Sequence, residues 1–195
     1  MTRAGSFLWI LVGLALHGSA VANTLANPDF DTGLSGWSAF GGTWSPFDLD
    51  GDPNSGSALL SGTDQLSQCV PVVPGTIPTG GASVFVPSGQ SGSANVFVSV
   101  TYFQGDDCFG LGSNVQLFVN LVPLDTWTFV AASALPEVPA GFASGNFRLD
   151  FLSEQGEFEA YFDAARLRFV PEPVQILLST LIAAGILCLR RCGTA

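Results

Sequence analysis

The chain of 195 residues contains no lysine, and its single histidine, His17, lies within the first 22 residues. The remainder therefore cannot form a Ser-His-Asp or Cys-His hydrolase, an imidazole general base or a histidine-based catalytic zinc site. Only carboxylate chemistry of the glycosidase type remains. Its candidate pairs, Asp106 with Asp107 and Glu157 with Glu159, do not differ from ordinary surface acids. We therefore expect a protein that is not an enzyme, with a carboxylate-based glycosidase as a distant alternative.

Basic residues are scarce in the stretch from 23 to 169. It holds three arginines, Arg148, Arg166 and Arg168, against 15 acidic residues, a formal net charge of −12. Such a surface repels phosphate backbones, which argues against nucleic-acid binding. It attracts divalent cations and suits a neutral polysaccharide better than an anionic one, although acidity can also serve solubility alone. The length of this stretch predicts one domain with a sizeable core.

The N-terminus has the three regions of a secretory signal peptide. Arg3 supplies the charge, Phe7 to Leu16 form a short apolar stretch, and Ala20-Val21-Ala22 supply the small residues at the cleavage site. Cleavage is expected after Ala22, which makes residues 1–22 the signal peptide. A buried N-terminal helix or an uncleaved anchor is the alternative, but the apolar stretch is short for either.

Cysteine is rare, and its positions follow compartments. Cys69 and Cys108 are the only two in the exported stretch. An even number in an oxidising compartment predicts a disulfide between them, because free thiols there become oxidised or cross-linked. Cys188 and Cys192 lie near the C-terminus, where each is at most a weak candidate for acylation.

Helical periodicity is absent between the two ends, and alternation with a period of two replaces it. Glycine, proline, serine and asparagine separate the alternating segments, which is typical of short strands joined by turns. At this length the pattern predicts an all-β, two-sheet antiparallel sandwich. The residues expected to share one face in each segment are Val96, Val98, Val100 and Tyr102; Val115, Leu117 and Val119; Phe147, Leu149 and Phe151; and Phe158, Ala160 and Phe162.

The C-terminus combines an extended motif, an apolar run and a basic stop. Val170-Pro171-Glu172-Pro173 precedes 16 residues, 174–189, which span about 24 Å as a transmembrane helix. Arg190 and Arg191 begin the basic tail, 190–195, which the positive-inside bias keeps in the cytoplasm. This string resembles the PEP-CTERM sorting signal of Gram-negative bacteria. The resemblance implies recognition by exosortase, passage through the inner membrane to the surface or extracellular matrix, and association with exopolysaccharide. An ordinary C-terminal membrane anchor is the alternative.

Three motifs within residues 23–169 resemble carbohydrate-binding-module jelly rolls. They are the opening stretch from Asn27 to Trp37, the stretch Asp125-Thr126-Trp127-Thr128-Phe129-Val130, and the final stretch from Ala160 to Leu167. The resemblance implies a jelly roll, secretion and, in many members, glycan binding. Asp31 stands where the family usually has glutamate, and Pro28 where it usually has glycine.

The same resemblance implies a structural calcium ion between the first and last strands. Asp31 and Asp163 are its expected ligands, with Asp29 contributing its backbone. A second candidate is the loop 48–52, in which alternate acids with a glycine between them (Asp48, Asp50 and Asp52) resemble half of a calcium loop. It lacks the downstream glutamate of an EF-hand, and a solvated turn is its plain interpretation.

Exposed aromatic rings would be needed to bind a glycan, because sugars place their apolar faces on them. Trp37 and Trp127 are expected in the core. Trp44 is the candidate ligand-binding residue, with Tyr102 and Phe109 as weaker ones. Two functions remain open: a sorted surface or matrix protein whose jelly roll has a structural role, or a lectin-like module that binds a neutral glycan.

Overall fold

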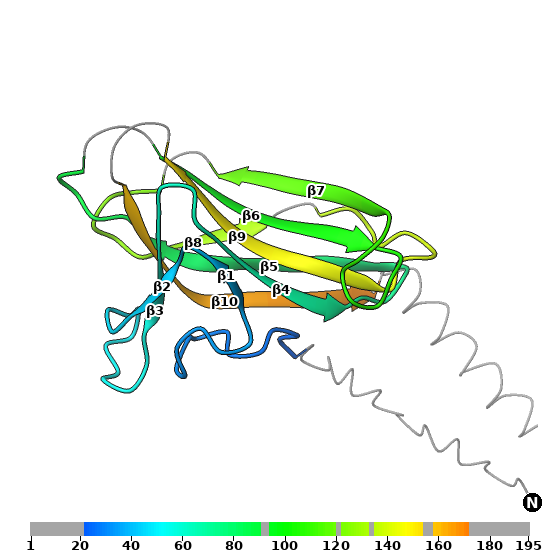
Figure 1. The fold of residues 1–195 in the computed structure, drawn as a ribbon, viewed down its shortest axis with the longest axis horizontal. Coiled ribbons are helices and arrows are strands. Elements are labelled where there is room, and N and C mark those ends of the chain that lie inside the picture. Colours follow the sequence, from blue (N-terminus) through cyan, green and yellow to red (C-terminus); the bar gives the residue numbers. More distant parts are fainter. Residues whose placement is uncertain (1–21, 91–93, 120–121, 133–134, 154–157, 172–195) are drawn as a thin grey trace, which may run out of the picture.

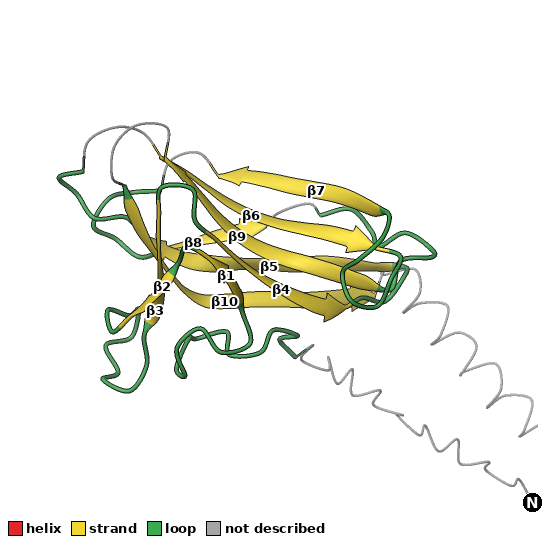
Figure 2. Ribbon diagram, viewed as in Figure 1, coloured by secondary structure: helices red, strands yellow, loops and turns green. Residues whose placement is uncertain are grey.

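Two stacked five-stranded sheets form the domain, as the computed structural model shows (Figure 1; Figure 2). The structure describes residues 22–90, 94–119, 122–132, 135–153 and 158–171. Neighbouring strands pair antiparallel throughout both sheets. The first sheet has the order β1 (Ser38–Phe40), β4 (Gln65–Pro71), β9 (Ser144–Ser153), β6 (Ala94–Phe103) and β7 (Gly112–Val119). The second has the order β2 (Thr43–Ser45), β3 (Ser57–Ser61), β10 (Glu159–Pro171), β5 (Thr76–Phe85) and β8 (Thr128–Ala132). The predicted all-β sandwich is confirmed.

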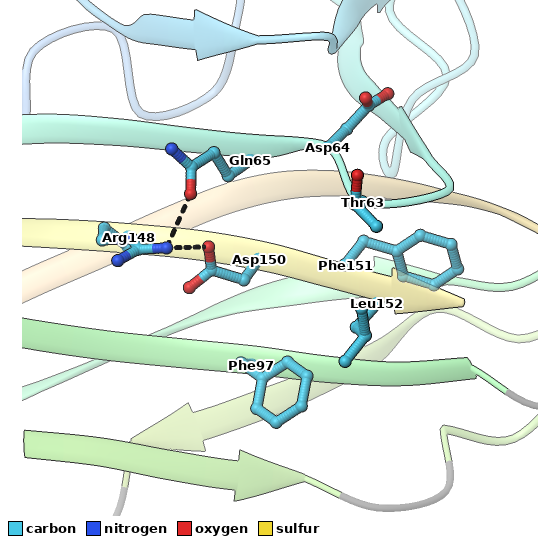
Figure 3. Close-up of a pocket in the computed structure, with 8 residues that line it drawn as sticks. All are labelled: Thr63, Asp64, Gln65, Phe97, Arg148, Asp150, Phe151 and Leu152. Atoms are coloured by element: carbon cyan, nitrogen blue, oxygen red, sulfur yellow. Dashed lines mark hydrogen bonds and ion pairs between the residues drawn. The ribbon is translucent and has the colours of Figure 1, made fainter. Parts of the chain in front are cut away.

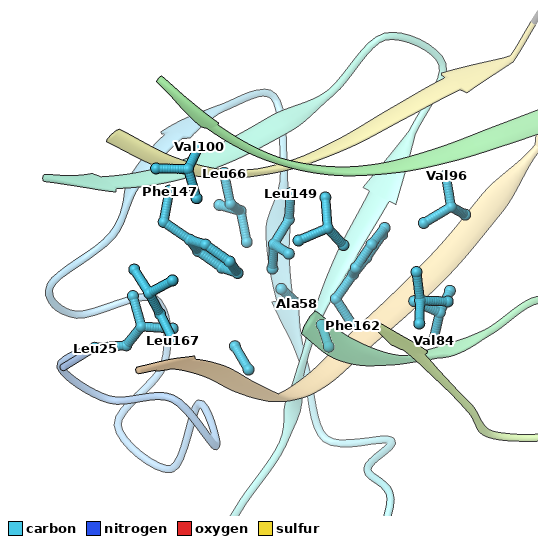
Figure 4. Packing of buried hydrophobic residues seen from close by; sticks show 14 of the residues in the cluster. Leu25, Ala58, Leu66, Val84, Val96, Val100, Phe147, Leu149, Phe162 and Leu167 are labelled. Atoms are coloured by element: carbon cyan, nitrogen blue, oxygen red, sulfur yellow. The ribbon is translucent and has the colours of Figure 1, made fainter. Parts of the chain in front are cut away.

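The core lies between the sheets and is built mainly from alternate residues of β3, β4, β5, β6, β9 and β10 (Figure 4). The predicted inward faces of β6, β9 and the start of β10 are confirmed, because these side chains are buried while their neighbours face outward. Trp37 also lies in this core, with its ring centroid 5.3 Å from that of Phe30 and 6.1 Å from that of Phe147. The buried faces are those of Val96, Val98, Val100 and Tyr102; Phe147, Leu149 and Phe151; and Phe158, Ala160 and Phe162.

A β-bulge interrupts β10 after Asp163. Asp163 pairs with Ser83 and Arg166 pairs with Gly81, so β10 has one residue more than β5 between these pairs. Ala164 takes up the extra residue with a φ of 47°, a left-handed value. A bulge of this kind re-aims the side chains that follow it. Here Ala165 and Leu167 are buried, and the side chains of Arg166 and Arg168 are exposed.

The first described residues lie against the last strand. The backbone N–H of Thr24 donates to the carbonyl of Leu167 at 2.9 Å, and the N–H of Ala165 donates to the carbonyl of Pro28 at 2.9 Å. Asn23 adds a side-chain bond to the carbonyl of Ala165 at 2.8 Å. These hydrogen bonds hold the start of the domain on β10, at the place where the sequence predicts a calcium ion.

Strand β10 runs two residues beyond the predicted domain boundary. Val170 pairs with Ile77 and Pro171 with Thr76, so the first half of the predicted sorting motif is strand. Glu172, Pro173, Arg190 and Arg191 lie outside the described residues, as do the segment 174–189 and residues 1–21 of the predicted signal peptide. Within the described part of the chain, no helix has the length and hydropathy to cross a membrane.

Candidate functional site

The predicted disulfide between Cys69 and Cys108 is present, with its Cα atoms 5.8 Å apart. Cys69 lies on β4, and Cys108 lies in the loop that joins β6 to β7. Since β9 stands between β4 and β6, the bond draws this loop across β9. The backbone N–H of Cys108 also donates to the Ser144 hydroxyl on β9 at 2.9 Å. The loop is therefore attached to one end of the outer surface of the first sheet.

We call the outer surface of the first sheet, formed by the outward side chains of β1, β4, β9 and β6, the first-sheet face. Its residues are the alternates of core residues such as Leu66, Leu149 and Val98. The strand register aligns four of them in one row across the sheet, because Gln65 pairs with both Phe40 and Asp150, and Asp150 pairs with Phe97. At about 4.8 Å between strands, the row is about 14 Å long. An aromatic ring lies at each end of the row, and two polar side chains lie between the rings.

Arg148 lies next to the centre of this row (Figure 3). Its Nη2 donates to Asp150 Oδ1 at 2.6 Å in an ion pair, and to Gln65 Oε1 at 2.6 Å. Its Nε is buried and has no hydrogen-bond partner within the described residues. Burial raises the pKa of Asp150, and the hydrogen bond and charge of Arg148 lower it. The two charges compensate each other, so this pair presents donors and acceptors without a net charge.

A shallow depression of about 370 Å³ lies over this group. Thr63, Asp64 and Leu152 form its rim together with Phe97, Gln65 and the ion pair. Ser67 and Ser99 lie on either side of Arg148 in the next row, on β4 and β6. Phe40 is 67% exposed at the edge of the sheet. Rings that can accept the apolar side of a sugar thus flank groups that can bond its hydroxyls.

Sequence reasoning did not select Phe40, Gln65, Phe97, Arg148 or Asp150 as site residues. The alternation that assigned Phe147, Leu149 and Phe151 to the core implies that the residues between them face outward, so a signal for Arg148 and Asp150 existed. No local signal aligns them with Gln65 and Phe40, because that alignment comes from the strand order and register.

The three aromatic residues selected from the sequence lie in separate places. The Tyr102 side chain is 1% exposed, its hydroxyl donates to the Pro136 carbonyl at 3.2 Å, and burial raises its pKa to about 12. A buried ring cannot serve as a sugar platform, so that prediction is wrong for Tyr102. The Trp44 ring is partly exposed, and its indole N–H donates to the Phe30 carbonyl at 2.9 Å. Phe109 is exposed in the disulfide-bonded loop.

Trp127 is half-buried, but not in the core between the sheets where it was expected. Its ring stacks on Phe47, with centroids 5.6 Å apart and planes inclined by 17°. Phe85 and Tyr161 complete a cluster of four rings on the outer surface of the second sheet. Phe47 belongs to the loop between β2 and β3, so the cluster packs this loop onto that sheet.

The same loop covers Asp163, which is 5% exposed. The backbone N–H of Leu49 donates to Asp163 Oδ2 at 2.9 Å, and that of Ala164 donates to Oδ1 at 2.6 Å. Burial, together with the charges of Asp29 and Asp48, raises the pKa of Asp163 to about 6 against these two bonds. The charge of Asp31, the expected partner, is not among the causes of this shift. It raises the pKa of Asp29 instead.

Asp163 of the first calcium candidate therefore lies near Asp48 of the second. Asp48 is buried and accepts hydrogen bonds from the Gly51 N–H at 2.5 Å and from the Ser55 hydroxyl. Asp50 and Asp52 are exposed, and each accepts a backbone N–H of the loop. No three acidic, cysteine or histidine side chains in the described ranges converge as a metal site would require. A buried carboxylate with a raised pKa beside other acids nevertheless fits a cation, because carboxylates and carbonyls are calcium ligands.

Solved structures with this fold include several carbohydrate-binding modules. A family 61 module in complex with β-1,4-galactotriose is 15% identical, with a TM-score of 0.52, and the match covers 76% of this chain and 99% of that one. A family 16 module is 20% identical, with a TM-score of 0.55 over 74% of this chain and 99% of that one. The domain thus has the jelly-roll β-sandwich fold that these modules share.

The fold also occurs inside a larger protein. The enzymatically active domain of tailspike protein 4 from bacteriophage CBA120 is 17% identical, with a TM-score of 0.52, but the match covers only 21% of that chain. The sequence matches no protein-family model and no curated protein. At these identities the similarity establishes the fold but does not identify a ligand, which has to be inferred from the geometry of the surface.

Proposed function

We propose that this domain is a non-catalytic module that binds a neutral glycan on the first-sheet face. The observation that carries the proposal is Arg148, held between Asp150 and Gln65 beside a row that has Phe40 and Phe97 at its ends. A neutral sugar chain matches this surface because it offers apolar ring faces and hydroxyls but no charge. The similarity in fold to modules whose structures contain or bind glycans supports the same function.

The chemistry of the pair favours a neutral ligand over an acidic one. Arg148 donates and Asp150 accepts, so vicinal hydroxyls of one sugar can bond both. A carboxylate placed there would meet an arginine that is already neutralised, within a domain whose net charge repels anions.

An array of neutral β-linked oligosaccharides, including galactans, xylans and glucans, tests the proposal with the full-length protein. We expect binding that falls at least tenfold in Arg148→Gln, because the variant loses the charged fork but keeps an amide of similar reach. Trp44→Ala, the platform selected from the sequence, should bind as the wild type does. No binding to any neutral glycan contradicts the proposal and favours a purely structural role for the jelly roll, and a loss confined to Trp44→Ala moves the site to the loop between β2 and β3.

We propose further that exosortase sorts the protein to the cell surface or extracellular matrix, where exopolysaccharide is the natural source of such a glycan. The support is the sequence of the C-terminus alone. In a host with its exosortase, the mature protein should lose the segment from about Pro171 onward. Mass spectrometry of the released protein checks this, and an intact Arg190-Arg191 tail on released protein contradicts it and favours a simple membrane anchor.

We propose also that a structural calcium ion binds near Asp163, with Asp29 and Asp48 as the neighbouring acids in place of Asp31. The ion would supply positive charge beside Asp163, whose pKa the charges of Asp29 and Asp48 already raise. At ~100-fold excess over its Kd it should stabilise the fold by about 2.7 kcal/mol. Equal melting temperatures in millimolar calcium and in excess chelator would rule the ion out.

A further inference from the structure

The outer surface of the second sheet, which we call the second-sheet face, carries two arginines without a carboxylate partner. Arg166 and Arg168 are exposed and follow the bulge at alternate positions of β10, so they point to the same side, about 7 Å apart. Neither forms an ion pair with any residue that the structure describes. Arg148 is the only other arginine of the domain, and its charge is already paired.

An aromatic ring lies directly beside these charges. The guanidinium carbon of Arg166 is 5.3 Å from the centroid of the Phe129 ring, which comes from β8 and is 45% exposed. Strand β5 separates β10 from β8, and Gly81 makes the contact possible. A Cβ at Gly81 would lie 2.8 Å from Cζ of Phe129, too close for a real side chain. The missing side chain therefore lets the ring lie over β5 and meet the arginine.

A second depression, of about 260 Å³, joins the ring to both arginines. Thr79 and Gly80 of β5 and Ala131 of β8 form the rest of its lining. Thr79 is paired with Arg168, so a hydroxyl stands next to the second guanidinium. The surface thus offers an apolar ring, a hydroxyl and two guanidinium groups around one hollow.

We propose that this hollow binds a sugar that carries a carboxylate, such as the uronic acid residues of an acidic polysaccharide. Guanidinium groups bind carboxylates through two parallel hydrogen bonds, and the exposed part of the Phe129 ring accepts the apolar face of the pyranose. This site shares no residue with the first-sheet face, so the two proposed binding sites can be tested independently. With both sites, one domain would join an acidic chain to a neutral one.

The charge of the whole domain selects against denser polyanions. With a formal net charge of −12 over residues 23–169, the protein repels nucleic acids and polyphosphates, and two arginines do not offset a phosphate at every unit. Arg166 also acts on one acid of the calcium region, since its charge lowers the pKa of Asp29. Arg168 lies two residues farther along β10 from Asp163, which makes it the cleaner position for a test.

Isothermal titration of the full-length protein with digalacturonate, a short oligogalacturonate with only two carboxylates, provides that test, with the carboxyl-reduced oligomer of the same linkage as the matched ligand. We expect the acidic oligomer to bind and the reduced one not to compete for this site. Arg168→Gln and Phe129→Thr should each weaken binding at least tenfold. Thr126→Asp is the control, because it changes the net charge as Arg168→Gln does but lies in the exposed turn before β8.

Three results would overturn the proposal. If the oligogalacturonate does not bind, or if the reduced oligomer displaces it, no carboxylate site exists here. If Thr126→Asp weakens binding as much as Arg168→Gln, the attraction is a general effect of charge. If millimolar inorganic phosphate displaces the oligomer and Phe129→Thr binds normally, the hollow is a simple anion site without sugar recognition. Melting curves of each variant confirm that the exposed substitutions leave the fold intact.

Discussion

The two outer faces of the sandwich use arginine in opposite ways. On the first-sheet face, Arg148 is bonded to Asp150 and Gln65, and the surface is polar but locally neutral. On the second-sheet face, Arg166 and Arg168 form no ion pair with the described residues, and Arg166 lies over an aromatic ring. The ligand class that each face suits therefore follows from the partner of its arginine more than from the arginine itself.

The faces differ also in what covers them. A disulfide-bonded loop is attached at one end of the first-sheet face and leaves the row from Phe40 to Phe97 open. The loop between β2 and β3 covers part of the second-sheet face, where Phe47 packs on Trp127 and Leu49 bonds Asp163. Each loop is fixed by a different chemistry, a covalent bond in one case and a buried carboxylate with an aromatic cluster in the other. These two attachments can be broken separately.

Removing the disulfide should have the largest effect on the domain. Cys69 and Cys108 are 39 residues apart, and a closed loop of this length stabilises a fold by about 2–4 kcal/mol. The double variant Cys69→Ser with Cys108→Ser should have a free energy of unfolding in denaturant that is lower by this amount. Its affinity for the neutral glycan should also fall. Binding of the acidic oligomer on the other face should not change once the protein is folded.

Reductant provides the control for this experiment. It should lower the stability of the wild type to that of the double variant and leave the double variant unaffected. Equal stability of the wild type with and without reductant would contradict the assigned role of the bond.

The carboxylate that fixes the other loop should make stability depend on pH. The pKa of Asp163 is raised from 3.8 to about 6, so folding favours its protonated form. Its stabilising contribution is present below pH 4 and is lost as the pH rises through 6, a change on the order of 2–3 kcal/mol. In chelator, the melting temperature should therefore fall between pH 4.5 and 7.5.

Asp163→Asn should remove this fall, because the amide keeps the shape and cannot ionise. The variant should have a flat pH profile and should not respond to calcium, although it loses one hydrogen bond because its amide NH2 faces the N–H of either Leu49 or Ala164. A wild-type profile that is flat or that rises across this window would show that Asp163 is not the controlling group.

A smaller effect is expected from the rings at the two ends of the row on the first-sheet face. Phe97→Ala and Phe40→Ala should each weaken binding of the neutral glycan by about 1 kcal/mol, roughly fivefold in affinity, because a stacking surface is lost. Affinity titration measures both, and Phe109→Ala serves as the control because that exposed ring lies outside the row. If only Phe109→Ala weakens binding, the ligand contacts the disulfide-bonded loop instead of the row.

Much of the fold could be predicted because alternation reports burial directly. The strand from Ala94 to Phe103 shows this, and the same pattern already placed Tyr102 inward, which should have excluded it as a surface ligand. The bulge at Ala164 had no such signal. Unbroken alternation from Phe158 would have turned Arg166 toward the core, and only the extra residue turns it outward.

The sites themselves depend on contacts between distant parts of the chain. Leu49 and Asp163 are 114 residues apart, and Gln65 and Arg148 are 83 apart. Alternation assigns each of these residues to a face of its own strand but cannot say which strand is its neighbour. For that reason the sequence assigned Asp163 and Asp48 to separate sites, although they lie near each other, and did not find the polar row on the first-sheet face.

The most direct test of the glycan-binding account is to locate a bound neutral oligosaccharide by amide chemical shifts. A β-1,4-galactotriose, or the best neutral ligand from the array, is titrated into the isotope-labelled full-length protein. The account predicts shifts at Gln65, Phe97, Arg148 and Asp150, with none at Thr79, Phe129 or Arg168. Shifts confined to the second-sheet face or to the loop around Trp44, or none at saturating concentrations of every neutral oligosaccharide, would contradict it.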